Sequence, residues 1–202
     1  MKREAADQGR VIFTVGHSNH ELERFVELLD ARGVKLLVDV RSQPYSGYTP
    51  HFNRRELEVS LPARGIDYEF LGQALGGMPE DAEFYDQHGH VMYSRIAESP
   101  AFQDGIAALT ERIGRVRAAL MCGEEDPRNC HRRLLIGRVL MENGVSVLHI
   151  LADGTVKSEE ELRREEADQD RQLSLFPAEE NQEWKSTRSV SPKKAPKNFS
   201  KR

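Results

Sequence analysis

The chain has 202 residues, of which 38% are hydrophobic and 31% charged, which suffices for one core and is too little for two. Its 29 basic and 33 acidic residues nearly cancel, so the formal charge of -4 excludes a bulk attraction to nucleic acid or membrane. No apolar run reaches bilayer length and the opening MKREAADQGR lacks a signal region, so we expect a cytoplasmic protein. Its cysteines, Cys122 and Cys130, are then expected as free thiols.

Short apolar runs alternate with amphipathic stretches from residue 11 to residue 157. This order predicts an α/β domain with a mainly parallel sheet of about four to five strands and helices on both faces. Residues 73–98 follow no clear period. The predicted strands are 11–16, 35–41, 66–72, 117–122 and 145–150, and the predicted helices are 20–33, 54–65, 100–114 and 130–144, the last capped by Asn129.

The chain divides by composition into a flexible N-terminus (1–10), the domain (11–157) and a charged tail (158–202). The tail begins with an acidic, helix-permissive stretch whose only apolar residue is Leu162, so it has almost nothing to bury. Residues 185–202 contain seven basic residues, no acidic residue and two prolines. Such a composition predicts a disordered segment, and its cations could touch DNA phosphates.

Polar residues follow three of the predicted strands. Ligands of parallel sheets bind beyond the carboxyl ends of the strands, so these side chains are expected to converge. Strand alternation also places Asp39 and Arg41 on one side, where they form either a structural ion pair or part of a catalytic site. The residues at the three strand ends are His17 and Ser18, Asp39 and Arg41, and Cys122 and Glu124.

The segment MCGEEDPRNCHRR (121–133) carries the most chemistry. A helix start near Asn129 would favour anions and lower the pKa of a thiol, so Cys122 is a candidate nucleophile with His131 or His17 as its base. The alternative is that Cys122 packs as a small apolar residue, and the two thiols could also form a redox pair.

Two further hypotheses for this segment are weaker. Cys122 to Arg128 fits the C-x5-R loop of cysteine phosphatases, but the three carboxylates inside it would repel phosphate and Pro127 removes an amide donor. A zinc site at Cys122, Cys130 and His131, with a fourth ligand such as His17, lacks a C-x2-C pair and needs adjacent Cys and His ligands. We therefore expect no metal and no cofactor.

Four runs share motifs with one bacterial family: TVGHSNHELERFVELL, LLVDVRSQPYSGYTPHFNRREL, GIDYEFLGQALGG, and ALMCGEEDPRNCHRRLLIGRVL with VSVLHI. From residue 11 to residue 152 the chain resembles the family called domain of unknown function 488. The resemblance implies an α/β domain and no established reaction. Arg128, although it lies within the last run, is not one of the family's signature positions. The resemblance marks as signature positions His17, Asp39, Arg41, Pro44, Cys122, Glu124, Cys130, His131 and Arg132.

The candidate site combines these residues with a loop at 43–55. In it, aromatic residues alternate with cations, an arrangement that can stack unpaired bases, although the aromatics could instead cover the core. Glu124 or His17 is the expected general base, and Arg41 and Arg132 the anion-binding groups. The catalytic set is His17, Asp39, Arg41, Cys122, Glu124, Cys130, His131 and Arg132, and the substrate-binding set is Ser18, Pro44, Tyr45, Tyr48, Phe52 and Arg54.

The tail contains an apolar pentapeptide, Gln172-Leu173-Ser174-Leu175-Phe176. It resembles the peptide with which bacterial polymerases and repair proteins bind the DNA sliding clamp, and a segment with a few apolar anchors suits a preformed pocket. The alternatives are a segment folded back on the domain and a chance match. Three functions follow: a DNA-maintenance protein acting on nucleic acid or a nucleotide-derived group, a non-catalytic adaptor, and a thiol enzyme unrelated to DNA.

Overall fold

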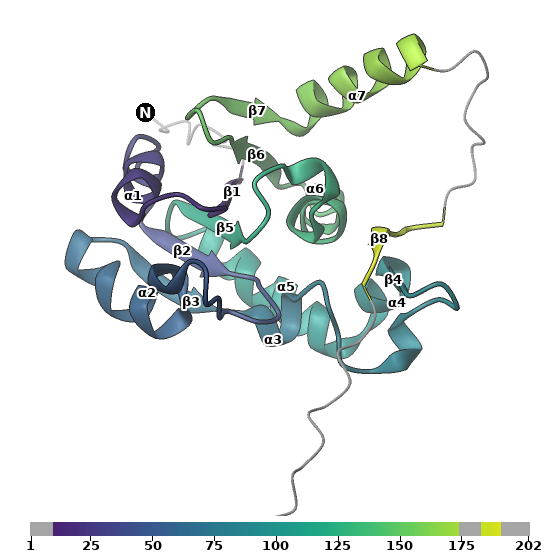
Figure 1. The fold of residues 1–202 in the computed structure, drawn as a ribbon, viewed down its shortest axis with the longest axis horizontal. Helices are drawn as coiled ribbons and strands as arrows, with labels where there is room; N and C mark the ends of the chain where they lie inside the picture. The colour runs from purple at the N-terminus through teal and green to yellow at the C-terminus, as the bar shows by residue number, and fades with distance from the viewer. Residues whose placement is uncertain (1–9, 174–182, 191–202) are drawn as a thin grey trace, which may run out of the picture.

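The computed structural model describes residues 10–173 and 183–190. They form an α/β domain around a six-stranded sheet in the order β3-β2-β5-β1-β6-β7, parallel except for β7 (Figure 1). The predicted fold class is confirmed, with the antiparallel β7 as an additional strand. The strands are β1 (Val11–Gly16), β2 (Leu36–Asp39), β3 (Asp67–Phe70), β5 (Ala118–Cys122), β6 (Ser146–Ile150) and β7 (Val156–Ser158).

Two apolar clusters, one on each face of the sheet, hold helices against it. Strand alternation explains the division: Leu36 and Val38 face one cluster, and Leu37 between them faces the other. Helices α1 (Leu22–Asp30) and α2 (Arg54–Ser60) cover one face, and α5 (Pro100–Ile113) and α6 (Arg138–Glu142) cover the other (Figure 1). Burial on both faces accounts for the continuous apolar character of β5.

The strand order creates a switch point at β5. The chain runs from β1 past one position to β2 and on to β3, and it later returns to place β5 between β1 and β2. Connections leave the carboxyl ends of these neighbouring strands in opposite directions, which opens a crevice there. The residues that follow β1, β2 and β5 therefore meet at one edge.

The segment after β5 is not one regular capped helix, which corrects the prediction for 130–144. A 3-10 turn at Pro127–Asn129 is followed by a π-helical segment at Arg132–Gly137, and only then by α6. Asn129 ends the 3-10 turn and does not cap a helix. Widened π turns occur often at functional sites because they redirect side chains, and here Cys130 and His131 lie at the entrance of this segment.

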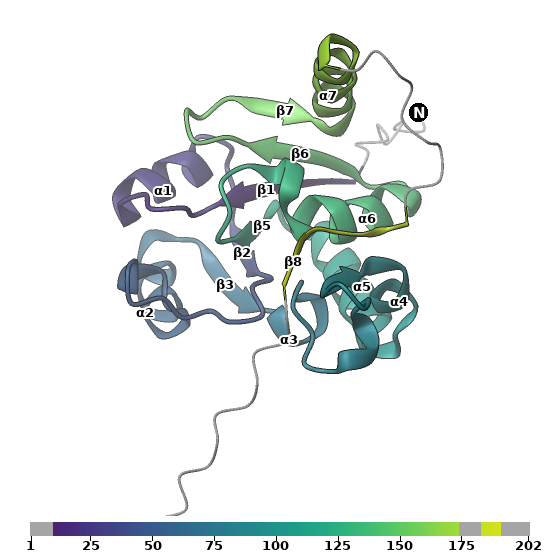
Figure 2. The same ribbon diagram turned by 45° about the vertical axis from the view of Figure 1, so that its right-hand side comes forward.

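Residues 73–98, which showed no sequence period, contain short elements: α3 (Gly72–Leu75), β4 (His90–Met92) and α4 (Tyr93–Glu98). Strand β4 pairs antiparallel with β8 (Lys185–Ser189), close to one hundred positions later in the chain. Trp184 fixes the start of β8, because its indole N–H donates to the Leu134 carbonyl at 2.7 Å. Lys185–Ser189 is thus a strand on the domain, which corrects the expectation of disorder for this part of 185–202 (Figure 2).

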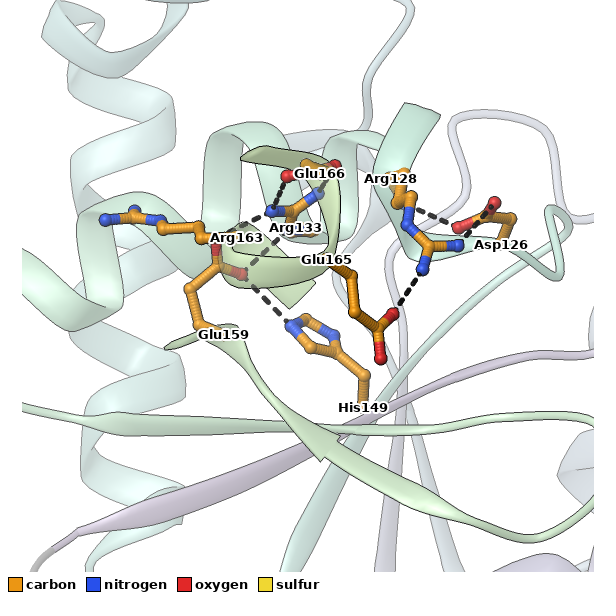
Figure 3. Close-up of polar contacts among 8 residues, drawn as sticks. All are labelled: Asp126, Arg128, Arg133, His149, Glu159, Arg163, Glu165 and Glu166. Carbon is orange, nitrogen blue, oxygen red and sulfur yellow. Dashed lines mark hydrogen bonds and ion pairs between the residues drawn. The ribbon is translucent and has the colours of Figure 1, made fainter. Parts of the chain in front are cut away.

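The acidic stretch forms α7 (Glu159–Leu173), which is bound to the domain by charge (Figure 3). Arg133, only 5% exposed, donates to Glu159 and Glu166, and Glu159 also contacts the ring of the buried His149 at 3.2 Å. A buried guanidinium needs such partners, and the glutamates of α7 supply them. The sequence prediction counted only apolar residues in this stretch and therefore did not anticipate that its carboxylates attach it to the domain. No helix in the described ranges is long and apolar enough to cross a membrane.

Candidate functional site

A cavity of about 370 Å³ lies at the carboxyl edge of β1, β2 and β5. The strand ends supply His17, Arg41, Cys122 and Glu124 to its lining, and the segment after β5 supplies His131. The pairing of β1 with β5 continues past the strands, since the N–H groups of His17 and Ser18 donate to the carbonyls of Cys122 and Gly123. The predicted convergence of the three strand ends therefore has a physical basis in this extended pairing.

A buried charged network underlies one wall of the cavity. Asp39 is fully buried and accepts from Arg41 Nε at 2.9 Å, from Arg41 Nη2 at 2.6 Å and from the Tyr68 hydroxyl at 2.7 Å. Arg41 also donates to the Phe52 carbonyl at 2.7 Å. Both carboxylate oxygens and most guanidinium donors are thereby used, so the network braces the loop after β2 and leaves Asp39 no contact with a ligand.

His17 is held as a neutral ring between two fixed partners. Its Nδ1 donates to the Ser18 carbonyl at 2.9 Å, so Nε2 is the acceptor and receives a hydrogen from Arg41 at 3.0 Å. Burial lowers the pKa of His17 to about 4, and the nearby Arg41 charge adds to the effect. Since its acceptor nitrogen is occupied, His17 is poorly placed to remove a proton from a substrate.

The thiols of Cys122 and Cys130 converge on one nitrogen of His131. Cys122 Sγ lies 3.7 Å and Cys130 Sγ 3.8 Å from Nδ1. On the far side of the ring, Nε2 donates to the Val40 carbonyl at 2.9 Å. This hydrogen bond fixes the ring, and it leaves Nδ1 to face the two sulfurs.

The three groups favour a thiolate at Cys122. A hydrogen bond from Cys130 lowers the pKa of Cys122 against the effect of burial, and the charges of His131 and Arg132 add to it. Burial and the neighbouring Cys122 thiolate raise the pKa of Cys130. Burial alone would lower the pKa of His131, but the charge and hydrogen bond of Cys122 raise it. These shifts favour negative charge on Cys122, a neutral thiol at Cys130 and positive charge on His131.

Two glycines allow the backbone to approach closely around this cluster. A Cβ on Gly16 would lie 2.0 Å from the Glu124 carbonyl oxygen, and one on Gly77 would lie 2.5 Å from Cγ of His131. Any side chain at these positions would displace the loop after β5 or the imidazole. Next to Gly16 and His17, Ser18 adopts a left-handed φ of 45°, a strained conformation for a non-glycine residue that directs its carbonyl to His17.

The arginines near the cluster have structural partners. Arg132 is fully buried and donates to the carbonyls of Glu124 and Glu125, which holds the loop after β5 and leaves it unavailable to an anion in the cavity. Arg128 contacts Asp126 at 3.3 Å and Glu165 at 2.7 Å (Figure 3). It takes no part in the cavity lining, which argues further against a phosphatase loop from Cys122 to Arg128.

The loop at 43–55 is only partly directed to the cavity. Tyr45 lines it and is 77% exposed, whereas Tyr48 is fully exposed outside the lining. Phe52 is fully buried and stacks on His17 with ring centroids 4.4 Å apart, so it has no face left for a base. Arg54 pairs with Glu58 and lies over the Phe70 ring. Ser18 and Pro44, both partly buried, are also outside the lining.

The cavity has lining residues that sequence reasoning missed. Tyr93, at the start of α4, lies close enough to the thiols and Glu124 to sense their charge, and burial raises its pKa. Strand β8 contributes Ser186, Thr187 and Arg188 from the far end of the chain. Arg188 is exposed, and its guanidinium has no hydrogen bond or ion pair within the described residues. Neither an apolar period nor a motif marked these positions.

Little of the pentapeptide is placed. Gln172 and Leu173 form the end of α7, and Ser174, Leu175 and Phe176 lie outside the described residues, as do residues 191–202 of the basic end.

Comparison with known proteins gives one match. A family model described as a domain of unknown function, DUF488, matches residues 21–139. No curated protein and no solved structure matches the chain. The matched segment includes the ends of β2 and β5, both thiols and His131, so the resemblance seen in the sequence motifs is confirmed for the part of the chain that builds most of the cavity.

Proposed function

The chain belongs to the DUF488 family, whose description assigns no reaction, and on that premise we propose from the site itself that the protein is a cysteine-dependent enzyme. One observation carries the proposal: Cys122 Sγ lies 3.7 Å from Nδ1 of His131 in the wall of a cavity of about 370 Å³. The thiolate is the reactive form of cysteine, and contact with a protonated imidazole favours it. A buried cysteine that only filled space would need neither partner nor cavity.

The arrangement supports covalent catalysis in two steps. The Cys122 sulfur forms a bond to an electrophilic atom of the substrate, and the bond from that atom to the leaving group breaks as the leaving group takes the Nδ1 proton of His131. Water then displaces the sulfur, gives its proton to Nδ1 and restores the ion pair. Arg41 and His17 act as positioning residues, since they hold the wall without reaching the sulfur.

For the substrate we propose nucleic acid or a nucleotide-derived group. The cavity volume is within the range of about 300–1,000 Å³ typical of small-ligand sites. Arg188 offers a cation for a phosphate, and the exposed Tyr45 offers a ring for a base at the rim. Glu124, exposed in the same lining, is the carboxylate that can accept a hydrogen bond from the substrate or activate water.

Alkylation of the full chain by iodoacetamide as a function of pH tests the catalytic thiolate. We expect Cys122 to react ahead of Cys130, with a midpoint well below the free-cysteine value of about 8.5. In the His131→Ala variant the midpoint should rise, and in Cys122→Ser the fast reaction should vanish, both followed by mass spectrometry of the modified peptide. A midpoint near 8.5 in the wild-type chain would contradict the proposal.

We also propose recruitment to DNA by a bacterial sliding clamp through residues 172–176. Support comes from the sequence: all five residues agree with the clamp-binding pentapeptide, with three apolar anchors in a strongly charged tail. The test is direct binding of the full chain to a purified clamp. A variant with Leu173→Ala and Phe176→Ala should lose binding, whereas Tyr48→Ala, an exposed aromatic residue elsewhere, should keep it. Equal binding by both variants would remove the pentapeptide from the interface.

A further inference from the structure

We infer that Cys122, Cys130 and His131 form a binding site for a thiophilic divalent cation, zinc above all, with one coordination position open to the cavity. Their ligand atoms all lie within 4.8 Å of one another. Two sulfurs and an imidazole nitrogen are the donors that zinc prefers. This inference goes beyond the proposed function, because the site would bind the cation whether or not Cys122 attacks a substrate.

The interatomic distances are close to those of a tetrahedral site. With zinc–sulfur bonds of about 2.3 Å and zinc–nitrogen bonds of about 2.0–2.1 Å, a sulfur and a nitrogen on one tetrahedral ion are separated by about 3.6 Å. The two observed separations from Nδ1 are 3.7 Å to Cys122 Sγ and 3.8 Å to Cys130 Sγ. Both sulfur–nitrogen separations are therefore within a few tenths of an ångström of the tetrahedral value, and the two sulfurs lie within 4.8 Å of each other.

The surroundings of His131 match those of a metal ligand. A ligating histidine usually donates its other ring N–H to a carbonyl or carboxylate, which fixes the ring and makes the free nitrogen a stronger donor. Here Nε2 donates to the Val40 carbonyl at 2.9 Å, and Nδ1 is left to face the sulfurs. Because Nδ1 is the ring nitrogen nearer the backbone, the adjacent Cys130 reaches the same point, which removes the objection to neighbouring Cys and His ligands.

The site has a balanced charge and an opening. Two thiolates and a neutral imidazole would neutralise a divalent cation. Cys122 and His131 line the cavity, whereas Cys130 is buried behind them, so the fourth position faces the cavity. His17 does not fill it, since its Nε2 accepts from Arg41. Three protein ligands with one open position are the arrangement of reactive zinc sites, and closed structural sites have four.

Cation binding and thiolate chemistry exclude each other at this site. A cation would occupy the sulfur lone pair that attacks a substrate, so bound zinc would protect Cys122 from alkylation. The two uses can therefore be separated experimentally on one protein.

The test uses the reduced, chelator-treated full chain. Zinc binding is measured by calorimetry, and cobalt binding by the absorption of thiolate-bound cobalt. We expect one ion per chain and loss of iodoacetamide reactivity at Cys122 on addition of zinc, restored by a chelator. Cys130→Ser, which preserves side-chain volume, should weaken zinc binding by at least about tenfold. His88→Ala, which removes an exposed histidine outside the cluster, should leave binding unchanged.

The outcomes separate the two proposals. No saturable zinc binding, or binding unchanged by Cys130→Ser, overturns the cation site, and rapid alkylation of Cys122 in the same sample would leave the thiol enzyme standing. Tight zinc binding with a slowly alkylated Cys122 in the metal-free chain would support the cation site and contradict the nucleophile. Circular dichroism of each variant checks that a lost signal does not come from unfolding.

Discussion

Arg41 donates through Nε and Nη2 to both carboxylate oxygens of Asp39, at 2.9 and 2.6 Å, although the two residues are separated by a single position in the chain. Residues two positions apart in an extended segment share a side, and the extended pairing with β5 continues past β2, since the Val40 N–H donates to the Met121 carbonyl. The pair is almost fully buried, with exposed fractions of 7% for Arg41 and 0% for Asp39. Because both side chains are buried, replacing one of them would leave the charge of the other buried without a partner.

Asp39→Asn is expected to lower the free energy of unfolding by about 3–5 kcal/mol, because it leaves the Arg41 guanidinium buried without its counter-charge. The measurement is urea denaturation of the full chain. Asp67→Asn, at an exposed position on neighbouring β3, is the matched control and should change stability by less than about 0.5 kcal/mol. Unchanged stability of Asp39→Asn would show that this network does not brace the fold and would return Asp39 to the list of reacting groups.

Cys130→Ala is expected to raise the pKa of Cys122, because the hydrogen bond from Cys130 is the largest influence that lowers it. The pH midpoint of alkylation at Cys122 reports the change. Cys130→Ser is the informative partner variant, since its hydroxyl can still donate to the thiolate and should keep the midpoint closer to that of the wild type. If alanine and serine at position 130 gave the same midpoint, the hydrogen bond would not be the cause.

Deletion of residues 183–202 should open the cavity without unfolding the domain. Among the residues that the structure describes, β8 pairs with β4 alone, outside the six-stranded sheet, yet it supplies Ser186, Thr187 and Arg188 to the lining. We expect faster alkylation of Cys122 at neutral pH and nearly unchanged circular dichroism. Deletion of residues 191–202 alone is the control and should leave the rate unaltered. Because Trp184 is the only tryptophan, its fluorescence can report undocking of β8 in the full chain.

Acid should destabilise the protein in two steps. The pKa of His17 is lowered from 6.5 to about 4 by burial and Arg41, so the unfolded state binds more protons. Stability is then full above pH 6.5 and falls as the pH drops toward 4, by an amount on the order of 3 kcal/mol at about 1.4 kcal/mol per pKa unit. Urea denaturation at several pH values should show this fall, and His17→Gln should reduce it. An equal fall in both proteins would place the cause elsewhere.

The second step involves the docking of α7. Although burial opposes it, hydrogen bonds from His149 and Arg133 lower the pKa of Glu159 from 4.5 to about 2. The folded value again lies below the unfolded one, so this contribution is present above pH 4.5 and is lost as the pH falls toward 2. Proteolysis within α7 as a function of pH would detect it, and Glu159→Gln should make the helix susceptible already at neutral pH.

The sequence predicts those features of the fold that depend on local pattern. The apolar period predicts the five strands and the helices at 20–33 and 100–114. The sequence did not predict the N-cap of the second helix, Ser99, which accepts the Phe102 N–H at 3.4 Å. The convergence of His17, Asp39 and Cys122 followed from one rule about parallel strands. It required no knowledge of side-chain positions.

The remainder depends on contacts between distant segments. Lys185–Ser189 has no apolar alternation, so the sequence does not predict it as a strand. Its pairing with β4 depends on the tertiary positions of α4 and Trp184. The loop aromatics looked alike in sequence, yet Phe52 is buried beneath His17 while Tyr48 is exposed. The approach of Cys130 and Cys122 to one ring nitrogen depends on the irregular turn after β5, which replaced the regular helix expected from the sequence.

Residues 174–182 connect two elements that are both attached to the domain, α7 through Arg133 and β8 through Trp184. A chain extends by at most about 3.5 Å per residue, so the end of α7 and the start of β8 can lie no more than about 35 Å apart. A protein bound to the pentapeptide would therefore hold the mouth of the cavity, which β8 helps to form, within a few nanometres of itself.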